Sequence, residues 1–259
     1  MSWPINDKHS IEVAAFVLTF SRHFLPEEVA SLASLKETLK DKLPSFEFIS
    51  SIEISYEANV VSHRQSEKKG VLLQKIKPDG KPAWLLRVEQ NSILVNCFEY
   101  ERWDTSFPPV LDLLIHAARL VSNEENPLSS VVHQVVDRFV LPTECEYSIA
   151  EVFEVESKYL TRQANESGDL WHVHQGWFDV QEDMKLLNVL NLGTNVTPSG
   201  HISTIDHAIH LRDKVLPAEK AANSEWLEMM FGLMHEKNKT IVRDLLNTVQ
   251  LEAIGLNES

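Results

Sequence analysis

The order of strand-like and helix-like segments is the feature that most restricts how this chain can fold. Extended segments rich in β-branched and aromatic residues predominate, and most of them are joined by short turns. Short turns connect antiparallel neighbours. The sequence therefore predicts an α+β fold in which helices pack on antiparallel sheet.

In the first half, a buried strand is expected at residues 11–20, followed by a helix between Pro26 and Pro44. Pro26 and the two acidic residues after it are typical of a first helical turn. Four extended segments are expected at residues 46–58, 70–77, 83–90 and 92–100. A second helix, opened by Phe107-Pro108-Pro109, carries one apolar stripe and is expected to end near Pro127.

The second half repeats this order. A strand is expected directly after Pro127, and a helix over residues 149–160. Extended segments are expected at residues 171–180, 185–196 and 201–213, and a long helix at residues 221–246. The repeated order predicts two pseudo-repeated lobes, residues 1–127 and 128–259. Each lobe is expected to be a curved antiparallel sheet with helices on one face, in the orders β-α-β-β-β-β-α and β-α-β-β-β-α.

The charge and the cysteines restrict partners and compartment. With 38 acidic and 24 basic residues, the chain has a formal net charge of −14, which disfavours nucleic acid as a partner despite the basic run around Lys68-Lys69. Cys97 and Cys145 have no paired spacing that would indicate a disulfide framework or a thiolate zinc site. Because a signal-peptide pattern and an apolar run of about 20 residues are both missing, we expect a cytoplasmic protein that does not enter a membrane.

Signatures of common enzyme classes are also missing. The 8 glycines are scattered and form no phosphate-binding loop, and the turn around Ser199 lacks the helix that a nucleophile elbow needs. The acids at positions 151, 154 and 156 are typical of a solvated face. Catalysis is therefore not the first interpretation of this sequence.

Histidine is enriched, with 11 residues, and His172 and His174 lie on one expected strand. Residues two apart share a strand face, so both could ligate one divalent metal ion, with His207 and either Asp206 or Glu182 as further ligands. Asp206 and His207, however, point to opposite faces of a regular strand. Two interpretations therefore stay open: the histidines form a metal site, or they have no shared role. No cofactor is predicted outright.

Two groups of aromatic residues are candidate sites for a protein partner. Tyr100 and Trp103 flank Arg102 directly before an expected helix, and such a cluster either fixes the helix on the sheet or anchors a partner. Trp171 and Trp177 form the second group and fall, together with the neighbouring Phe178, on both faces of one strand. One face of this strand is therefore expected to expose aromatic rings as a binding surface does.

Several strings spread over most of the chain resemble a sporadically distributed family of uncharacterised bacterial proteins of similar length. They are Pro4 with Ile11-Glu12-Val13, Tyr100-Glu101-Arg102-Trp103 followed by Phe107, and Leu233-Met234-His235-Glu236; Val242 stands where the family pattern has phenylalanine. The resemblance implies a scattered distribution like that of defence-associated or toxin–antitoxin-like genes. It supplies no activity and no site residues.

These observations favour a non-enzymatic interaction or accessory protein of a bacterial defence or toxin–antitoxin-like module. It would bind a protein partner through a sheet surface or through the groove between its lobes, and a homo-oligomer is compatible with the sequence. The alternative is a sensor or enzyme that binds a small ligand or a metal in a sheet-lined pocket containing the histidines. A co-purifying protein would support the first hypothesis, and a bound metal or ligand the second.

Overall fold

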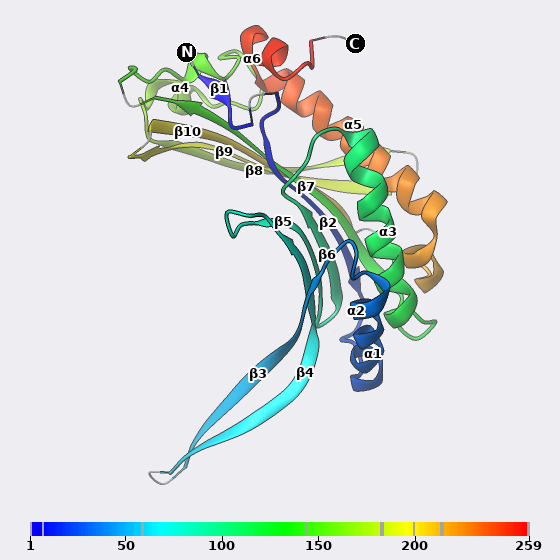
Figure 1. The fold of residues 1–259 in the computed structure, drawn as a ribbon. Coiled ribbons are helices and arrows are strands. Elements are labelled where there is room, and N and C mark those ends of the chain that lie inside the picture. Colours follow the sequence, from blue (N-terminus) through cyan, green and yellow to red (C-terminus); the bar gives the residue numbers. More distant parts are fainter. Residues whose placement is uncertain are drawn as a thin grey trace.

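A computed structural model describes residues 2–6, 8–57, 60–142, 144–181, 184–198, 200–212 and 215–257, with only the backbone described for residues 51–57 and 60–67. Its centre is a curved ten-stranded sheet in the order β3-β4-β5-β6-β2-β7-β10-β9-β8, with β1 paired to the end of β7 (Figure 1). The pairings between these strands are antiparallel. The α+β class predicted from the sequence is confirmed.

The strands are β1 (Trp3–Pro4), β2 (Ile11–Phe20), β3 (Ser45–Glu57), β4 (Val60–Ile76), β5 (Pro82–Glu89), β6 (Ser92–Cys97), β7 (Leu128–Leu141), β8 (Trp171–Gln181), β9 (Met184–Thr197) and β10 (Gly200–Leu211). The helices are α1 (Pro26–Ser31), α2 (Leu35–Thr38), α3 (Trp103–Val121), α4 (Arg162–Glu166), α5 (Ser224–Leu245) and α6 (Thr248–Ala253). Short 3₁₀ turns lie at Leu32–Ser34, Ile149–Glu151 and Ala218–Ala222. No described helix is long and apolar enough to cross a membrane.

The two halves of the chain follow similar paths within the one sheet. The first long strand of each half, β2 or β7, lies at the centre, where the two pair with each other. From there the chain runs to an outer strand, β3 or β8, and returns by a meander to the strand beside its starting point. Residues 1–127 and 128–259 therefore share one sheet, and a pseudo-repeat of two lobes stays a prediction.

The predicted helix over residues 149–160 is wrong. Its apolar residues are buried as expected, with Ile149, Val152 and Phe153 at most 7% exposed, but the segment forms only the 3₁₀ turn Ile149–Glu151. Its internal backbone bonds, such as those from the Phe153 N–H to the Ile149 carbonyl and from the Ser157 N–H to the Glu154 carbonyl, form isolated turns, and other backbone groups bond to residues at and just after the end of α5. The Glu154 N–H donates to the Leu245 carbonyl at 2.8 Å, and the Val152 carbonyl accepts from the Asn247 N–H at 3.1 Å.

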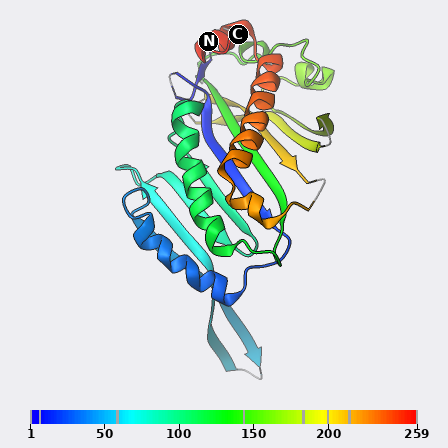
Figure 2. The same cartoon turned by 90° about the vertical axis from the view of Figure 1, so that its right-hand side faces the viewer.

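The helices α1, α3 and α5 cover the convex face of the sheet (Figure 2). Alternate residues of each strand point to them, because side chains on a strand alternate between faces. Phe16 of β2 is 1% exposed, and its ring lies 5.7 Å from Phe107 of α3 and 5.2 Å from Phe231 of α5. Fully burying such a side chain stabilises the fold by about 1.5–3 kcal/mol. Core residues from both halves of the chain therefore hold the helices on this face.

Candidate functional site

The concave face of the sheet lies open, because none of the described helices packs against it (Figure 1). The central strand β7 shows the difference between the two faces. Val131 and Val135 point to the helices and are at most 2% exposed, whereas Val132 and Val136 point to the concave side and stay partly exposed. The concave residues are shielded mainly by their neighbours on the same face.

Directly paired residues form an apolar row across this concave face. From β4 to β8, the row consists of Leu72, Arg87, Leu94, Val17, Val132, His210, Leu187 and Phe178. Only Arg87 and His210 interrupt its apolar character. Phe178, at the β8 end of the row, is 66% exposed. Continuous apolar surface open to solvent is typical of an interaction site.

The next row along the strands has small side chains on both sides of its central residue, Gln134. Ala15 of β2 and Ala208 of β10 lie on either side of Gln134, and Gly176 of β8 ends the row. Short side chains at the centre allow another backbone to approach the sheet more closely than the flanking leucines and valines would.

A hydrogen-bonded polar row crosses the same face on β7, β10, β9 and β8. The Asp206 carboxylate accepts from Gln134 Nε2 at 2.6 Å through Oδ1 and from Asn191 Nδ2 at 3.3 Å through Oδ2. His174 Nδ1 hydrogen-bonds with Asn191 Oδ1. Because Asn191 donates through its amide nitrogen, its oxygen accepts, so the His174 proton lies on Nδ1. His174 is exposed, and its Nε2 points away from this chain of bonds.

A second group of histidines is buried on the opposite side of the sheet, beneath α5. His133 of β7 is 2% exposed and stacks on Phe16 with a ring-centroid distance of 4.5 Å. His207 of β10 is 1% exposed; its Nε2 hydrogen-bonds with Asn188 Oδ1 at 3.2 Å and its Nδ1 with Asn238 Nδ2 at 3.0 Å. His235 of α5 is only partly buried and stacks on Trp103 with a ring-centroid distance of 4.1 Å. For brevity, we refer to His133, His207 and the partly buried His235 as the buried histidines.

Burial keeps these three rings uncharged near neutral pH. Loss of hydration lowers the pKa of His133 to about 3 and the pKa values of His207 and His235 to about 4. Their neighbours are mainly aromatic rings and amides, which do not compensate a positive charge. The buried histidines therefore act as polar parts of the core, with a direct effect on acid stability.

The predicted metal ligands do not come together. His172 and His174 share the concave face, as their spacing predicts, but His207 lies on the convex face among buried residues. Asp206 lies on the concave face and is held by two amides, and Glu182 lies outside the described residues. Among the described residues, no group of three or more histidine, cysteine or acidic side chains is arranged to hold a metal ion.

The first predicted aromatic group packs inside the protein. Tyr100 is 8% exposed, and Trp103 lies between Phe107, at a ring-centroid distance of 4.3 Å, and His235. Of the three predicted residues only Arg102 is well exposed, beside Asp104. This group therefore has the packing role, fixing α3 against α5.

The second aromatic group divides between the faces. Trp171 is 7% exposed and donates through Nε1 to Tyr147 Oη at 3.0 Å. Trp177 stacks on Tyr159 at 5.4 Å, on the helix-covered side of the sheet. The exposed aromatic residue of this strand is Phe178, which belongs to the apolar row.

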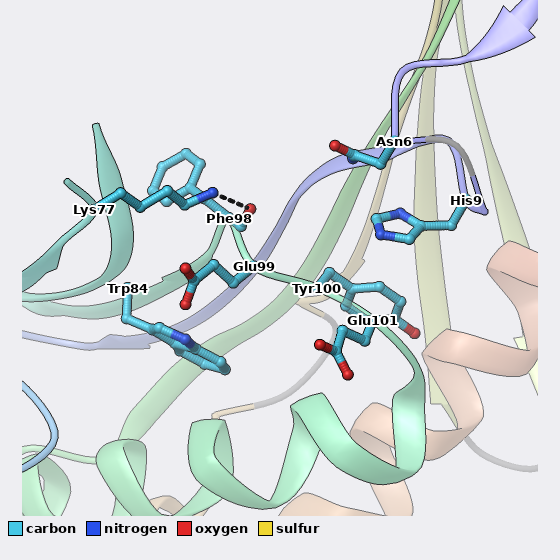
Figure 3. A pocket seen from close by; sticks show the side chains of 8 residues that line it. All are labelled: Asn6, His9, Lys77, Trp84, Phe98, Glu99, Tyr100 and Glu101. Atoms are coloured by element: carbon cyan, nitrogen blue, oxygen red, sulfur yellow. Dashed lines mark hydrogen bonds between the residues drawn. The ribbon is translucent and has the colours of Figure 1, made fainter. Parts of the chain in front are cut away.

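A polar cavity of about 410 Å³ lies beside Tyr100, at the turn between β6 and α3 (Figure 3). It is lined by Asn6, His9, Lys77, Trp84, Phe98, Glu99, Tyr100 and Glu101. Glu99 pairs with Lys75 at 3.0 Å, and the ring of His9 meets that of Tyr100 edge-on at 6.0 Å. Burial lowers the pKa of His9 and raises that of Tyr100. The cavity offers carboxylates beside aromatic rings, which suits a small cationic ligand.

Sequence reasoning did not find the polar row or the buried histidines as groups. Gln134 and Asn191 are ordinary polar residues until the register places Asn191 opposite Asp206 and Gln134 diagonally beside it. The sequence did contain a signal for His133. It lies two residues from both Val131 and Val135, so the three share one strand face, which is buried. Such a position on a strand is typical of a core histidine.

Comparison with models of known protein families and with curated proteins finds no match to this chain. The resemblance to an uncharacterised bacterial family therefore stays a prediction. The candidate site is argued from its own geometry.

Proposed function

We propose that this chain is a non-catalytic interaction protein that docks a protein partner in the concave face of its sheet. The apolar row, which crosses eight strands without a covering helix among the described residues, carries this proposal. Following the sequence-based expectation, we place the protein in the bacterial cytoplasm, as an accessory component of a defence or toxin–antitoxin-like module.

The shape and charges of this face favour a protein over a nucleic acid. Its curvature suits a convex object, such as an α-helix of about 10–12 Å diameter. Charged side chains on this side are largely paired with each other: Arg138 Nη1 lies 2.8 Å from Glu12 Oε1, and Arg87 is paired with Glu89. No strong positive field of the kind that holds a phosphate backbone results from such pairs.

The test is affinity purification of the tagged protein from its native host, in parallel with two variants, Phe178→Asp and Val249→Asp. Phe178→Asp places a charge in the apolar row at a position that is 66% exposed, so we expect the fold to tolerate it. Val249→Asp places the same charge on α6, at a residue 50% exposed and outside the concave face.

We expect one stoichiometric partner to co-purify with the parent chain and with Val249→Asp and to be lost with Phe178→Asp. A partner retained by all three proteins would mean that it binds elsewhere. If only DNA or RNA co-purified and was released by moderate salt, the concave face would be a nucleic-acid surface and the proposal would fail.

A small-ligand function is the second candidate, and the cavity beside Tyr100 supports it. Two carboxylates, Glu99 and Glu101, lie next to the rings of Trp84 and Tyr100 (Figure 3). Native mass spectrometry of freshly purified protein would detect a bound molecule. Its loss in Glu101→Gln would assign it to this cavity, and a purely apo spectrum would remove this candidate.

A further inference from the structure

Asp206, in the middle of the concave face, has no basic partner within the part of the chain that the structure describes. The other two acids described above on this side, Glu12 and Glu89, are each paired with an arginine. Among the described residues, the bonds of Asp206 are to two neutral amides, those of Gln134 and Asn191. Its negative charge is therefore oriented but not neutralised.

The two amides fix the direction of the carboxylate before anything binds. Each oxygen of Asp206 accepts one hydrogen bond from a neighbouring strand, so the group is held on both sides across the sheet. A carboxylate has about four lone-pair positions, which leaves acceptor capacity on both oxygens. A guanidinium group can use two such oxygens at once through its planar fork.

The position of Asp206 relates it directly to the apolar row. Val136 on one side and Asn191 on the other are its direct neighbours, and Val132 and His210 of the apolar row lie four residues along the same strands. A chain docked in the concave face would cover Asp206 together with this row. Covering an uncompensated carboxylate costs free energy unless the incoming chain brings a positive charge.

We propose that the concave face binds an apolar protein segment that carries one arginine, whose guanidinium pairs with the Asp206 carboxylate. This inference rests on the proposed function and specifies the chemistry of the partner. The net charge of −14 also favours a segment without acidic residues.

A metal ion is a poorer match for Asp206. The amide nitrogens of Gln134 and Asn191 point their hydrogens at the carboxylate, and the last member of the polar row, His174, already bonds to Asn191 through Nδ1. These groups supply donors around the carboxylate and no second anionic ligand. A cation that itself donates hydrogen bonds, such as a guanidinium, fits the remaining acceptors.

The test uses a phage-displayed library of random peptides, selected on the immobilised full-length parent chain, on Asp206→Asn and on Glu12→Gln, and the selected peptides are also measured on Phe178→Asp. Asp206→Asn keeps the shape and removes the charge. Glu12→Gln is the matched control, because it neutralises an acid on the same side that already has Arg138 as partner. Thermal unfolding of all four proteins checks that the variants fold like the parent.

Peptides selected on the parent chain are expected to be apolar around one arginine. The best synthetic peptide should bind Asp206→Asn about 10- to 100-fold more weakly than the parent, as for loss of a charge-assisted hydrogen bond. Glu12→Gln should change its affinity by no more than about 2-fold. Replacing the peptide arginine by citrulline should weaken binding to the parent but not to Asp206→Asn, since the pair is already broken.

Three results would overturn the inference, and they separate it from the proposed function. If citrulline weakened binding equally to both proteins, the arginine would contact another group. If the peptides required Phe178 but carried no basic residue, the docking face would stand and the role of Asp206 would fall. If selection yielded no peptide sensitive to either Phe178→Asp or Asp206→Asn, both proposals would fail.

Discussion

Replacement of His133 by phenylalanine should make the protein more resistant to acid. The ring of His133 is buried beneath α5 and stacked on Phe16, and burial lowers its pKa from 6.5 to about 3. In the unfolded chain the same ring takes up a proton below about pH 6.5. A lowered pKa in the folded state therefore gives stability that is present above pH 6.5 and is lost as the pH falls toward 3.

The magnitude follows from the difference between the two pKa values. A pH of 5 lies 1.5 units below the pKa of 6.5 that the ring has in the unfolded chain, so the unfolded ring is protonated. The folded ring, with a pKa of about 3, is still neutral at this pH. At about 1.4 kcal/mol per unit, this costs roughly 2 kcal/mol of unfolding free energy between pH 7 and pH 5. His207 and His235, with pKa values of about 4, have comparable effects, so acid lability of the fold is expected. Total stabilities of about 5–15 kcal/mol make a loss of this size easy to observe.

The assay is urea unfolding of the parent chain and of His133→Phe at pH 7 and pH 5. Phenylalanine keeps the stacking on Phe16 and loses the bond between Nδ1 and the Ala15 carbonyl, at 3.2 Å, equally at both pH values. The loss between pH 7 and pH 5 should be smaller by about 2 kcal/mol in the variant. Val135→Ala, a core change on the same strand, should lower stability without altering the pH dependence. If His133→Phe lost as much stability as the parent between the two pH values, the reasoning would be refuted.

Two further changes test the core. Asp137 is 3% exposed, and its burial raises its pKa from 3.8 to about 6, so its stabilising neutral form is lost as the pH rises from about 4 to 6. Asp137→Asn should therefore reduce by about 2.4 kcal/mol the loss of unfolding free energy between pH 4 and pH 8. Urea titration of the variant and the parent measures this, and an unchanged difference would contradict it. Phe231→Ala removes a fully buried ring of α5 and should lower the free energy of unfolding by about 3–5 kcal/mol. Met229→Ala, at a residue 55% exposed on the same helix, should change it by no more than about 0.5 kcal/mol. Equal effects of the two variants in thermal unfolding would refute this packing.

Local patterns predict the elements of this protein where local interactions form them. The alternation in residues 11–20 predicts the strand that becomes β2, and the apolar stripe that includes Val110 and Leu114 predicts the helix α3. The segment at residues 149–160 shows the limit of such patterns. Its apolar spacing is helical, but it forms only isolated turns, and two of its backbone groups bond to Leu245 and Asn247, about 90 residues away in the chain.

The candidate site depends even more on distant pairing. Sequence reasoning placed His172 and His174 on one strand face and noted that Asp206 and His207 diverge, and both expectations follow from the two-residue period of a strand. It could not show that the helices cover the face of His207 and leave that of Asp206 open. Which face a helix covers is decided by the tertiary fold, and the polar row exists only through the register of β7, β10, β9 and β8.

Site-specific photocrosslinking in the native host tests the concave docking face most directly. A photoreactive phenylalanine derivative would replace Phe178 or Val132 on the concave face, and Met229 on the helix-covered side as control. If the partner docks in the concave face, one partner protein is crosslinked from positions 178 and 132 and not from position 229. Crosslinking of a partner from position 229 alone, with no adduct from either concave position, would contradict it.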